Sequence, residues 1–143
     1  MTRVPARFRL DARLAADTLP VTVLPLCALR LMDDARFPWL VLVPRRPGLV
    51  ELSDLAVADR VRLMEELVRA GAALRAQAAE AKLNVGALGN VVRQLHVHVV
   101  ARHPGDAAWP GPVWGHGTRR PYAPEAAHAL CASLRARLRQ PVP

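Results

Sequence analysis

The chain has 143 residues, of which 52% are hydrophobic, 22% charged and 4% aromatic, a composition typical of one globular domain spanning residues 1–143. No apolar run reaches the ~18–20 residues of a membrane-spanning helix, so we expect no membrane partner. The basic amino terminus is not followed by the apolar segment of a secretory signal, and the expected location is the cytoplasm.

The net charge of +8 suits a protein that binds phosphorylated ligands. Only Lys82 among the 20 basic residues is a lysine, and the 19 arginines are spread through nearly every segment. This distribution leaves nucleic acid open as a partner but does not favour it. The two cysteines, Cys27 and Cys131, form neither a CxxC motif nor a disulfide framework, so we predict buried free thiols.

The amino-terminal part predicts one short helix and three strands, interrupted at Pro25, which cannot donate to a strand ladder. The helix is expected at 11–16 and the strands at 21–24, 27–32 and 37–43. Asp33 and Asp34 follow the second strand in a predicted turn.

The central part predicts one long amphipathic helix from Asp54 to about Ala81. Apolar side chains recur along it at helical spacing: Val57, Val61, Met64, Val68 and Gly71, with Leu63, Leu67, Ala70 and Leu74 widening the stripe.

The remaining residues predict two more strands and a last helix, which favours an α+β fold with an antiparallel sheet over regular βαβ alternation. In order, these are a strand at 83–86, a glycine-rich turn at 86–90, a strand at 94–102, an irregular Pro- and Trp-rich segment at 103–123 and a helix at 124–139.

Chemistry is concentrated in the strand predicted at 94–102. Side chains alternate along a strand, which predicts a core face of Leu95, Val97, Val99 and Ala101. Gln94, His96 and His98 then share the other face. Two positions along a strand lie ~6.6 Å apart at the backbone, so both imidazoles can converge on one ligand.

Three interpretations of the His-x-His pair remain open from these residues. The rings can be satisfied histidines on an exposed sheet face. They can bind a metal with His103 or His116, although the nearest carboxylate, Asp106, lies in the following loop. They can also carry out nucleophilic chemistry at phosphorus, in which a neutral imidazole attacks and the second imidazole holds the phosphoryl oxygens.

The string Gln94-Leu95-His96-Val97-His98-Val99-Val100, with the glycine turn before it, resembles the histidine triad family of nucleotide hydrolases and transferases. The run Phe37-Pro38-Trp39-Leu40-Val41-Leu42-Val43-Pro44-Arg45-Arg46 adds to the resemblance, which covers about residues 24–102. The family motif is His-φ-His-φ-His-φ-φ, where φ is apolar. Gln94 stands here in place of the first histidine.

The resemblance implies a five-stranded antiparallel sheet with one long helix and a carboxy-terminal helix, paired as a homodimer. The long helix would pack across the sheet or at the two-fold axis. The implied activity is nucleotide hydrolysis or nucleotidyl transfer at an α-phosphate through a covalent nucleotidyl-histidine, without a cofactor. By resemblance His96 is the nucleophile, His98 hydrogen-bonds the phosphate or leaving-group oxygen, and Gln94 supports His96 from behind.

Substrate contacts are also implied by family position. Asn84, Gly89 and Asn90 correspond to phosphate contacts, whereas Val91 stands where the family tends to place Ser or Thr. Leu31 stands at the family's ribose-binding position, so the ribose contact is either shifted to Asp33 or absent. Trp109 and Trp114 are the candidates to wall the leaving-group side, with Arg102 or His103 facing phosphate oxygens. Two alternatives stay open: a non-catalytic nucleotide- or RNA-binding protein, and a metal-binding protein that uses the His-x-His pair.

Overall fold

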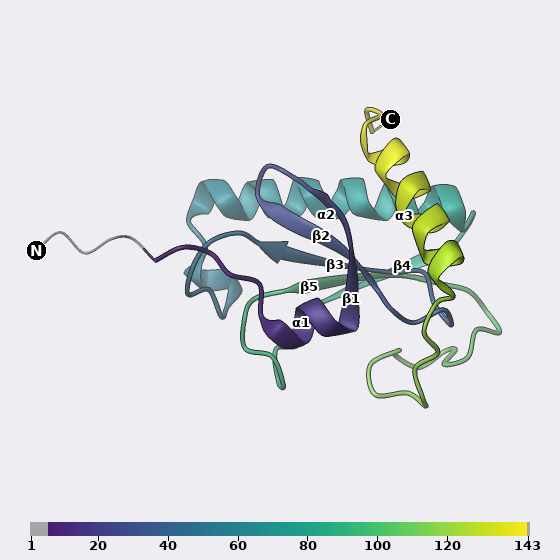
Figure 1. Ribbon diagram of the computed structural model, residues 1–143. Coiled ribbons are helices and arrows are strands. Elements are labelled where there is room, and N and C mark those ends of the chain that lie inside the picture. The colour runs from purple at the N-terminus through teal and green to yellow at the C-terminus, as the bar shows by residue number, and fades with distance from the viewer. Residues whose placement is uncertain (1–5, 143) are drawn as a thin grey trace, which may run out of the picture.

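Five strands form one antiparallel sheet in the order β1-β2-β3-β5-β4 in the computed structural model, which describes residues 6–142 (Figure 1). The strands are β1 (Thr18–Val23), β2 (Cys27–Met32), β3 (Trp39–Pro44), β4 (Lys82–Gly86) and β5 (Val97–Arg102). The helices are α1 (Ala12–Asp17), α2 (Val57–Gln77) and α3 (Pro124–Leu138), with a 3-10 turn, η1 (Leu52–Asp54), before α2. The predicted α+β class and the five-stranded antiparallel sheet are confirmed. Residues 1–5 and Pro143 of the predicted domain lie outside the described residues.

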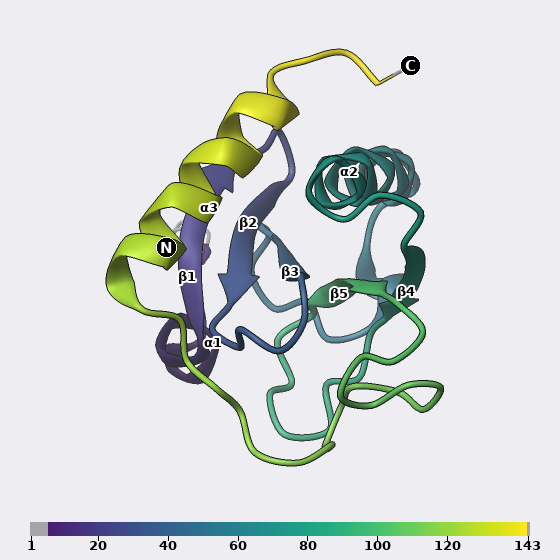
Figure 2. The same cartoon turned by 90° about the vertical axis from the view of Figure 1, so that its right-hand side faces the viewer.

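The two faces of the sheet are covered differently. Helices α2 and α3 lie over one face, whereas α1 and the segment 103–123 lie over the other (Figure 2). Alternation along β5 accounts for this division, because Val97 and Val99 belong to the core beneath the helices and Val100 belongs to the second core. The predicted core face of this strand is therefore confirmed.

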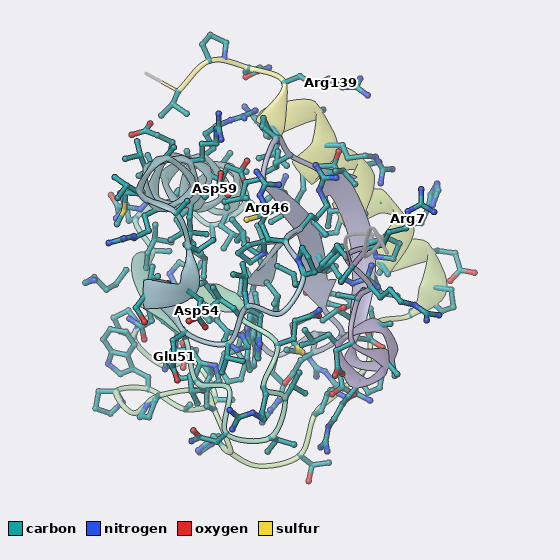
Figure 3. The ribbon with its side chains drawn as sticks, turned by 90° about the vertical axis from the view of Figure 1, so that its left-hand side faces the viewer. Arg7, Arg46, Glu51, Asp54, Asp59 and Arg139 are labelled. Atoms are coloured by element: carbon teal, nitrogen blue, oxygen red, sulfur yellow. The ribbon has the colours of Figure 1, made fainter. Side chains whose placement is uncertain are left out.

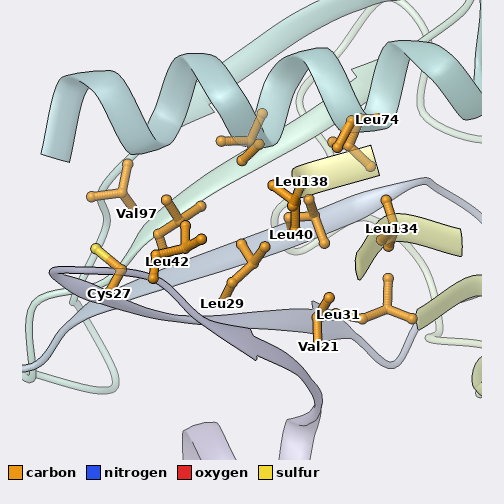
Figure 4. Close-up of a cluster of buried hydrophobic side chains, with 14 of the residues drawn as sticks. Val21, Cys27, Leu29, Leu31, Leu40, Leu42, Leu74, Val97, Leu134 and Leu138 are labelled. Atoms are coloured by element: carbon orange, nitrogen blue, oxygen red, sulfur yellow. The ribbon is translucent and has the colours of Figure 1, made fainter. Parts of the chain in front are cut away.

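The larger core is built mainly from leucine and valine side chains, with alanines and two cysteines between them (Figure 4). Leu31, Leu40 and Leu42 have no exposed surface, and they pack against Leu74 of α2 and Leu134 of α3. Each fully buried side chain of this size contributes about 1.5–3 kcal/mol, so this layer is the main source of stability and the rigid support for β5.

One carboxylate penetrates this core. Glu66 of α2 is 3% exposed and accepts hydrogen bonds from the backbone N–H groups of Leu26, at 2.7 Å, and Cys27, at 2.9 Å. It thereby satisfies two buried donors where Pro25 interrupts the β1–β2 connection. Cys27 and Cys131 are both buried and free, as predicted.

Helix α2 differs from the prediction at both ends and in its buried face. It begins at Val57 because Leu52–Asp54 forms a separate turn, and it ends at Gln77. Its buried side chains include Leu63, Ala70 and Leu74. The stripe formed by Val57, Val61, Met64 and Val68 is 50–68% exposed. Both stripes have helical spacing, and only the sheet decides which of them is covered. No helix within residues 6–142 is long and apolar enough to span a membrane.

Four of the five strands begin elsewhere than predicted. β3 begins at Trp39 instead of Phe37, and β4 begins at Lys82 instead of Leu83. β1 starts at Thr18 and passes through Pro20, which an edge strand with a register shift between Pro20 and Thr22 tolerates. β5 starts at Val97 instead of Gln94, because the preceding residues have other partners. The Leu95 N–H donates to the Leu49 carbonyl at 3.0 Å, outside the sheet.

Candidate active site

The rings of His96 and His98 lie next to each other at the start of β5. Their centroids are 5.0 Å apart and their planes meet at 73°, and the residues are 7% and 4% exposed. His98 is held within the sheet, opposite Val41 of β3 and Gly86 of β4. His96 immediately precedes the strand. The two imidazoles therefore share one site.

The backbone fixes the tautomer of His96. Its Nδ1 lies 2.7 Å from the carbonyl oxygen of Gln94, which can only accept a hydrogen bond. Nδ1 therefore carries the proton and donates. In the neutral ring the lone pair is consequently on Nε2, which is the nitrogen available for attack.

His98 has the opposite arrangement. The indole N–H of Trp39 donates to His98 Nδ1 at 2.9 Å, so this nitrogen is an acceptor and the proton of the neutral ring is on Nε2. Burial, with a smaller contribution from the neighbouring His96 ring, lowers the pKa of His98 to about 3. The ring is therefore a neutral donor at physiological pH.

Aromatic side chains enclose His98. Trp39 and Trp114 each place a ring centroid 5.6 Å from it, in edge-to-face geometry. Trp114 comes from the segment 103–123 and also contacts Gly86, where a Cβ atom would lie 3.2 Å from its ring. Glycine at position 86 therefore allows the tryptophan to approach the sheet beside His98.

A hollow of about 810 Å³ opens beside His96. One wall is the glycine turn, including Gly89 and Asn90, and the other consists of residues 50–53, at the beginning of η1. Gly89 has φ +66, a left-handed conformation that side chains rarely adopt, so glycine is required for the shape of this wall. The hollow brings together three of the predicted site residues: His96, Gly89 and Asn90.

The opposite wall is held by a carboxylate. Asp54 accepts from the backbone N–H groups of Val50, at 3.0 Å, and Glu51, at 2.8 Å, and these bonds lower the Asp54 pKa. Glu51 and Asp54 lie next to each other in Figure 3. Ser53 and Arg93, which also line the hollow, were not identified from sequence, because a lone serine or arginine in a loop carries no specific signal.

The family model described as HIT domain matches residues 14–105. The chain belongs to the HIT domain family. The match includes both imidazoles, the glycine turn and strands β1 to β5.

Solved HIT structures agree with this assignment over nearly the whole chain. A histidine triad (HIT) protein from Sinorhizobium meliloti 1021 is 45% identical, with a TM-score of 0.89, and the match covers 91% of this chain and 96% of that one. A histidine triad protein from Bradyrhizobium japonicum is 42% identical, with a TM-score of 0.90 and coverage of 93% and 99%. A third, from Marinobacter aquaeolei VT8, is 41% identical, with a TM-score of 0.90 and coverage of 93% and 97%. No curated protein matches.

The side chain of Gln94 points to the amino-terminal segment of this HIT domain. Its Oε1 accepts from the Asp11 N–H at 2.9 Å, and its Nε2 donates to the Arg9 carbonyl at 2.8 Å. His96 is instead contacted by the backbone carbonyl of residue 94. The resemblance implies that the Gln94 side chain supports His96, whereas in the structure the backbone carbonyl of Gln94 does so.

Arg102 and Asn84 lie on the same sheet face as His98 but bind each other. The Arg102 guanidinium donates to Asp106 at 2.7 and 2.9 Å and to Asn84 Oδ1 at 3.0 Å, and the residue is 2% exposed. It also lies 5.7 Å from the centroid of the Trp109 ring. Trp109, which is 40% exposed, therefore packs on Arg102, and Trp114 is the tryptophan that contacts His98.

Asp33 is engaged at the far end of β2. Its Oδ1 accepts from the Tyr122 N–H at 2.9 Å, which ties it to the segment before α3. Asp33 does not line the hollow beside His96. The structure thus separates the predicted ribose contact from the imidazole pair.

A metal site would need at least three convergent ligands. Within residues 6–142, no group of three or more His, Cys, Asp or Glu side chains is arranged to hold a metal ion. His103 and His116, the candidates to complete a set, come from the segment 103–123.

Proposed function

We propose that this HIT domain is a nucleotide hydrolase or nucleotidyl transferase that uses His96 as its nucleophile. The observation that carries the proposal is the bond from His96 Nδ1 to the Gln94 carbonyl, which leaves the Nε2 lone pair free beside an open hollow. Membership of a family of nucleotide hydrolases and transferases supports the same function.

The reaction has two steps. In the first, His96 Nε2 attacks the α-phosphorus, a nitrogen–phosphorus bond forms, and the bond to the leaving group breaks with its electron pair on that group. The positive charge on the substituted ring is stabilised by the Gln94 carbonyl dipole at Nδ1. In the second step, water or another acceptor attacks phosphorus, loses a proton to solvent, and the electron pair returns to Nε2.

His98 acts as a hydrogen-bond donor in this scheme. Its proton is on Nε2, and the ring remains neutral, so it can bind a phosphoryl oxygen without becoming charged. Donors aimed at developing charge are typically worth about 10²–10³ in kcat. Gly89 and Asn90 supply further phosphate contacts from the wall of the hollow.

The other predicted contacts remain predictions. Asp33, Arg102 and Trp109 already have partners, and Asn84 has its carbonyl oxygen bound to Arg102 but retains its amide donor.

A panel of nucleotide substrates tests the activity. Adenosine phosphoramidate and a dinucleoside polyphosphate would be incubated with wild type, His96→Ala and His98→Ala, and the products followed by chromatography. We expect turnover by wild type, a loss of about 10⁴-fold or more for His96→Ala, and about 10²–10³-fold for His98→Ala. Nucleotide binding without turnover in wild type would contradict the proposal and point to the non-catalytic alternative.

A homodimer is the second part of the proposal. The exposed stripe Val57, Val61, Met64 and Val68 lies on α2, and Val85 is 54% exposed on β4, one of the two edge strands of the sheet. An exposed apolar stripe beside an unpaired strand edge is a surface that a second copy covers well. Light scattering should give twice the monomer mass for wild type and the monomer mass for Val61→Glu. A monomeric wild type would contradict this assembly.

The thiols support the proposed cytoplasmic location. Burial raises the pKa of both Cys27 and Cys131, so both remain protonated and unreactive. Buried, unpaired cysteines are typical of a reducing compartment.

A further inference from the structure

We propose that Trp39 is a positioning residue that holds His98 as a permanent Nε2–H donor to the substrate. The inference rests on the proposed function, because it assigns the role of His98 within that site. The sequence gives Trp39 no marker other than its place in an apolar strand, and the pairing of β3 with β5 brings it to His98.

The contact is built by the sheet. Trp39 is 6% exposed on β3 and pairs with Val100 of β5, so its side chain lies on the same face as His98. The indole Nε1 and His98 Nδ1 are 2.9 Å apart, and the ring centroids are 5.6 Å apart at 60°. Phe37 packs edge-on against Trp39 at 6.4 Å and limits its rotation.

The chemistry of indole makes this contact one-directional. Hydroxyl, amide and imidazole groups can each donate or accept, so a partner of those types leaves the histidine free to change tautomer. Indole N–H can only donate. A proton on His98 Nδ1 would face this N–H directly, so both the Nδ1–H tautomer and the cation lose the hydrogen bond.

The other groups that surround His98 are compatible with a neutral ring protonated on Nε2. His96 is the titratable neighbour on β5, Trp114 contacts the ring from the segment 103–123, and β4 presents Gly86. Arg102, further along the same face, is neutralised by Asp106. Burial also disfavours the cation and lowers the pKa of His98 to about 3.

A neutral His98 that is a donor at Nε2 binds a phosphoryl or leaving-group oxygen but does not transfer a proton to it. The leaving group therefore takes its proton from water. Ionisation of His98 should be absent from the pH dependence of kcat between pH 5 and 8.

Nitrogen NMR of the full-length protein labelled with 15N-histidine tests the proposal without relying on activity. In wild type, His98 should show an unprotonated Nδ1 and a protonated Nε2, unchanged from pH 8 to pH 5. In Trp39→Phe, His98 should begin to titrate within this range, and kcat should fall about 10-fold and gain a second ionisation on its acid side. Phe37→Leu is the matched control, because it loosens the same packing but keeps the N–H donor, and its His98 signals should match wild type.

Two results would overturn the proposal. One is a wild-type His98 that carries its proton on Nδ1, a measurement that holds even if Trp39→Phe does not fold. The other is a folded Trp39→Phe whose His98 signals and pH profile match wild type. If the NMR result is as expected but no nucleotide is turned over, only the proposed function fails. If turnover occurs with the opposite tautomer, only the role of Trp39 fails.

Discussion

Replacing Gln94 with alanine separates the two roles that residue 94 has beside His96. The bond that fixes the nucleophile goes to the backbone carbonyl, which alanine retains, whereas the amide side chain binds Asp11 and Arg9. We therefore expect Gln94→Ala to form the covalent intermediate within about 3-fold of the wild-type rate, since a bond to the backbone is unchanged. Its cost should appear in stability.

The size of that cost follows from two hydrogen bonds, of 2.9 and 2.8 Å. Each contributes about 0.5–1.5 kcal/mol net, and both are partly exposed, which places the sum at about 1–2 kcal/mol. A change of 1 kcal/mol shifts Tm by roughly 3–4 °C in a chain of this size, so Tm should fall by about 3–8 °C.

Single-turnover kinetics and thermal unfolding, measured on the same preparations, provide the assay. Gln94→Glu is the comparison variant, because it keeps the acceptor for the Asp11 N–H but turns a carboxylate oxygen, which can only accept, toward the Arg9 carbonyl. It should lose at least as much stability as Gln94→Ala. A 100-fold slower formation of the intermediate in Gln94→Ala, with an unchanged Tm, would contradict this expectation. It would show that the side chain itself acts on His96.

Three further predictions concern the frame of the site. Asp106→Ala leaves the buried Arg102 guanidinium without its ion-pair partner, so the free energy of unfolding measured in urea should fall by about 3–5 kcal/mol. A loss below about 1 kcal/mol would show that the ion pair contributes little to stability. The hydrogen bond from Arg102 lowers the pKa of Asp106 to about 2, so its stabilisation is present above about pH 4 and is lost as the pH falls through 2. Wild type should lose about 2 kcal/mol from this group across that range, and Asp106→Asn should lack this component. Gly89→Ala forces a side chain into φ +66, so we expect about 1–2 kcal/mol of destabilisation. KM should rise, because Asn90 is displaced. An unchanged KM would show that this turn does not contact the phosphate.

Local periodicity explains what could be predicted from sequence. The alternation around His96 and His98 depends only on neighbouring residues, so it correctly separated the core face of β5 from the chemical face. The same is true of the carboxy-terminal helix, which begins at Pro124 as expected. Such patterns of apolar and polar residues within one element are reliable predictors, because the packing of the folded chain buries the apolar side that they indicate.

Contacts between distant segments explain what could not. Trp39 reaches His98 across 59 residues, and Asp33 is bound by Tyr122 across 89 residues, so neither partner is visible in a local pattern. The stripe on α2 shows a different limit, because two faces had helical spacing and only tertiary packing distinguished them. The ion pair of Arg102 with Asp106 was close in sequence but lies across a strand end and a turn, where no spacing rule applies.

The proposed hydrolase or transferase activity depends on a covalent bond between His96 Nε2 and phosphorus. The most direct measurement is intact mass spectrometry of the protein quenched during turnover of an adenosine phosphoramidate, followed by peptide mapping of the modified residue. We expect a nucleotidyl group on His96 in wild type and in Gln94→Ala, and no adduct in His96→Ala. Turnover by His96→Ala at the wild-type rate, or an adduct on another residue, would contradict it.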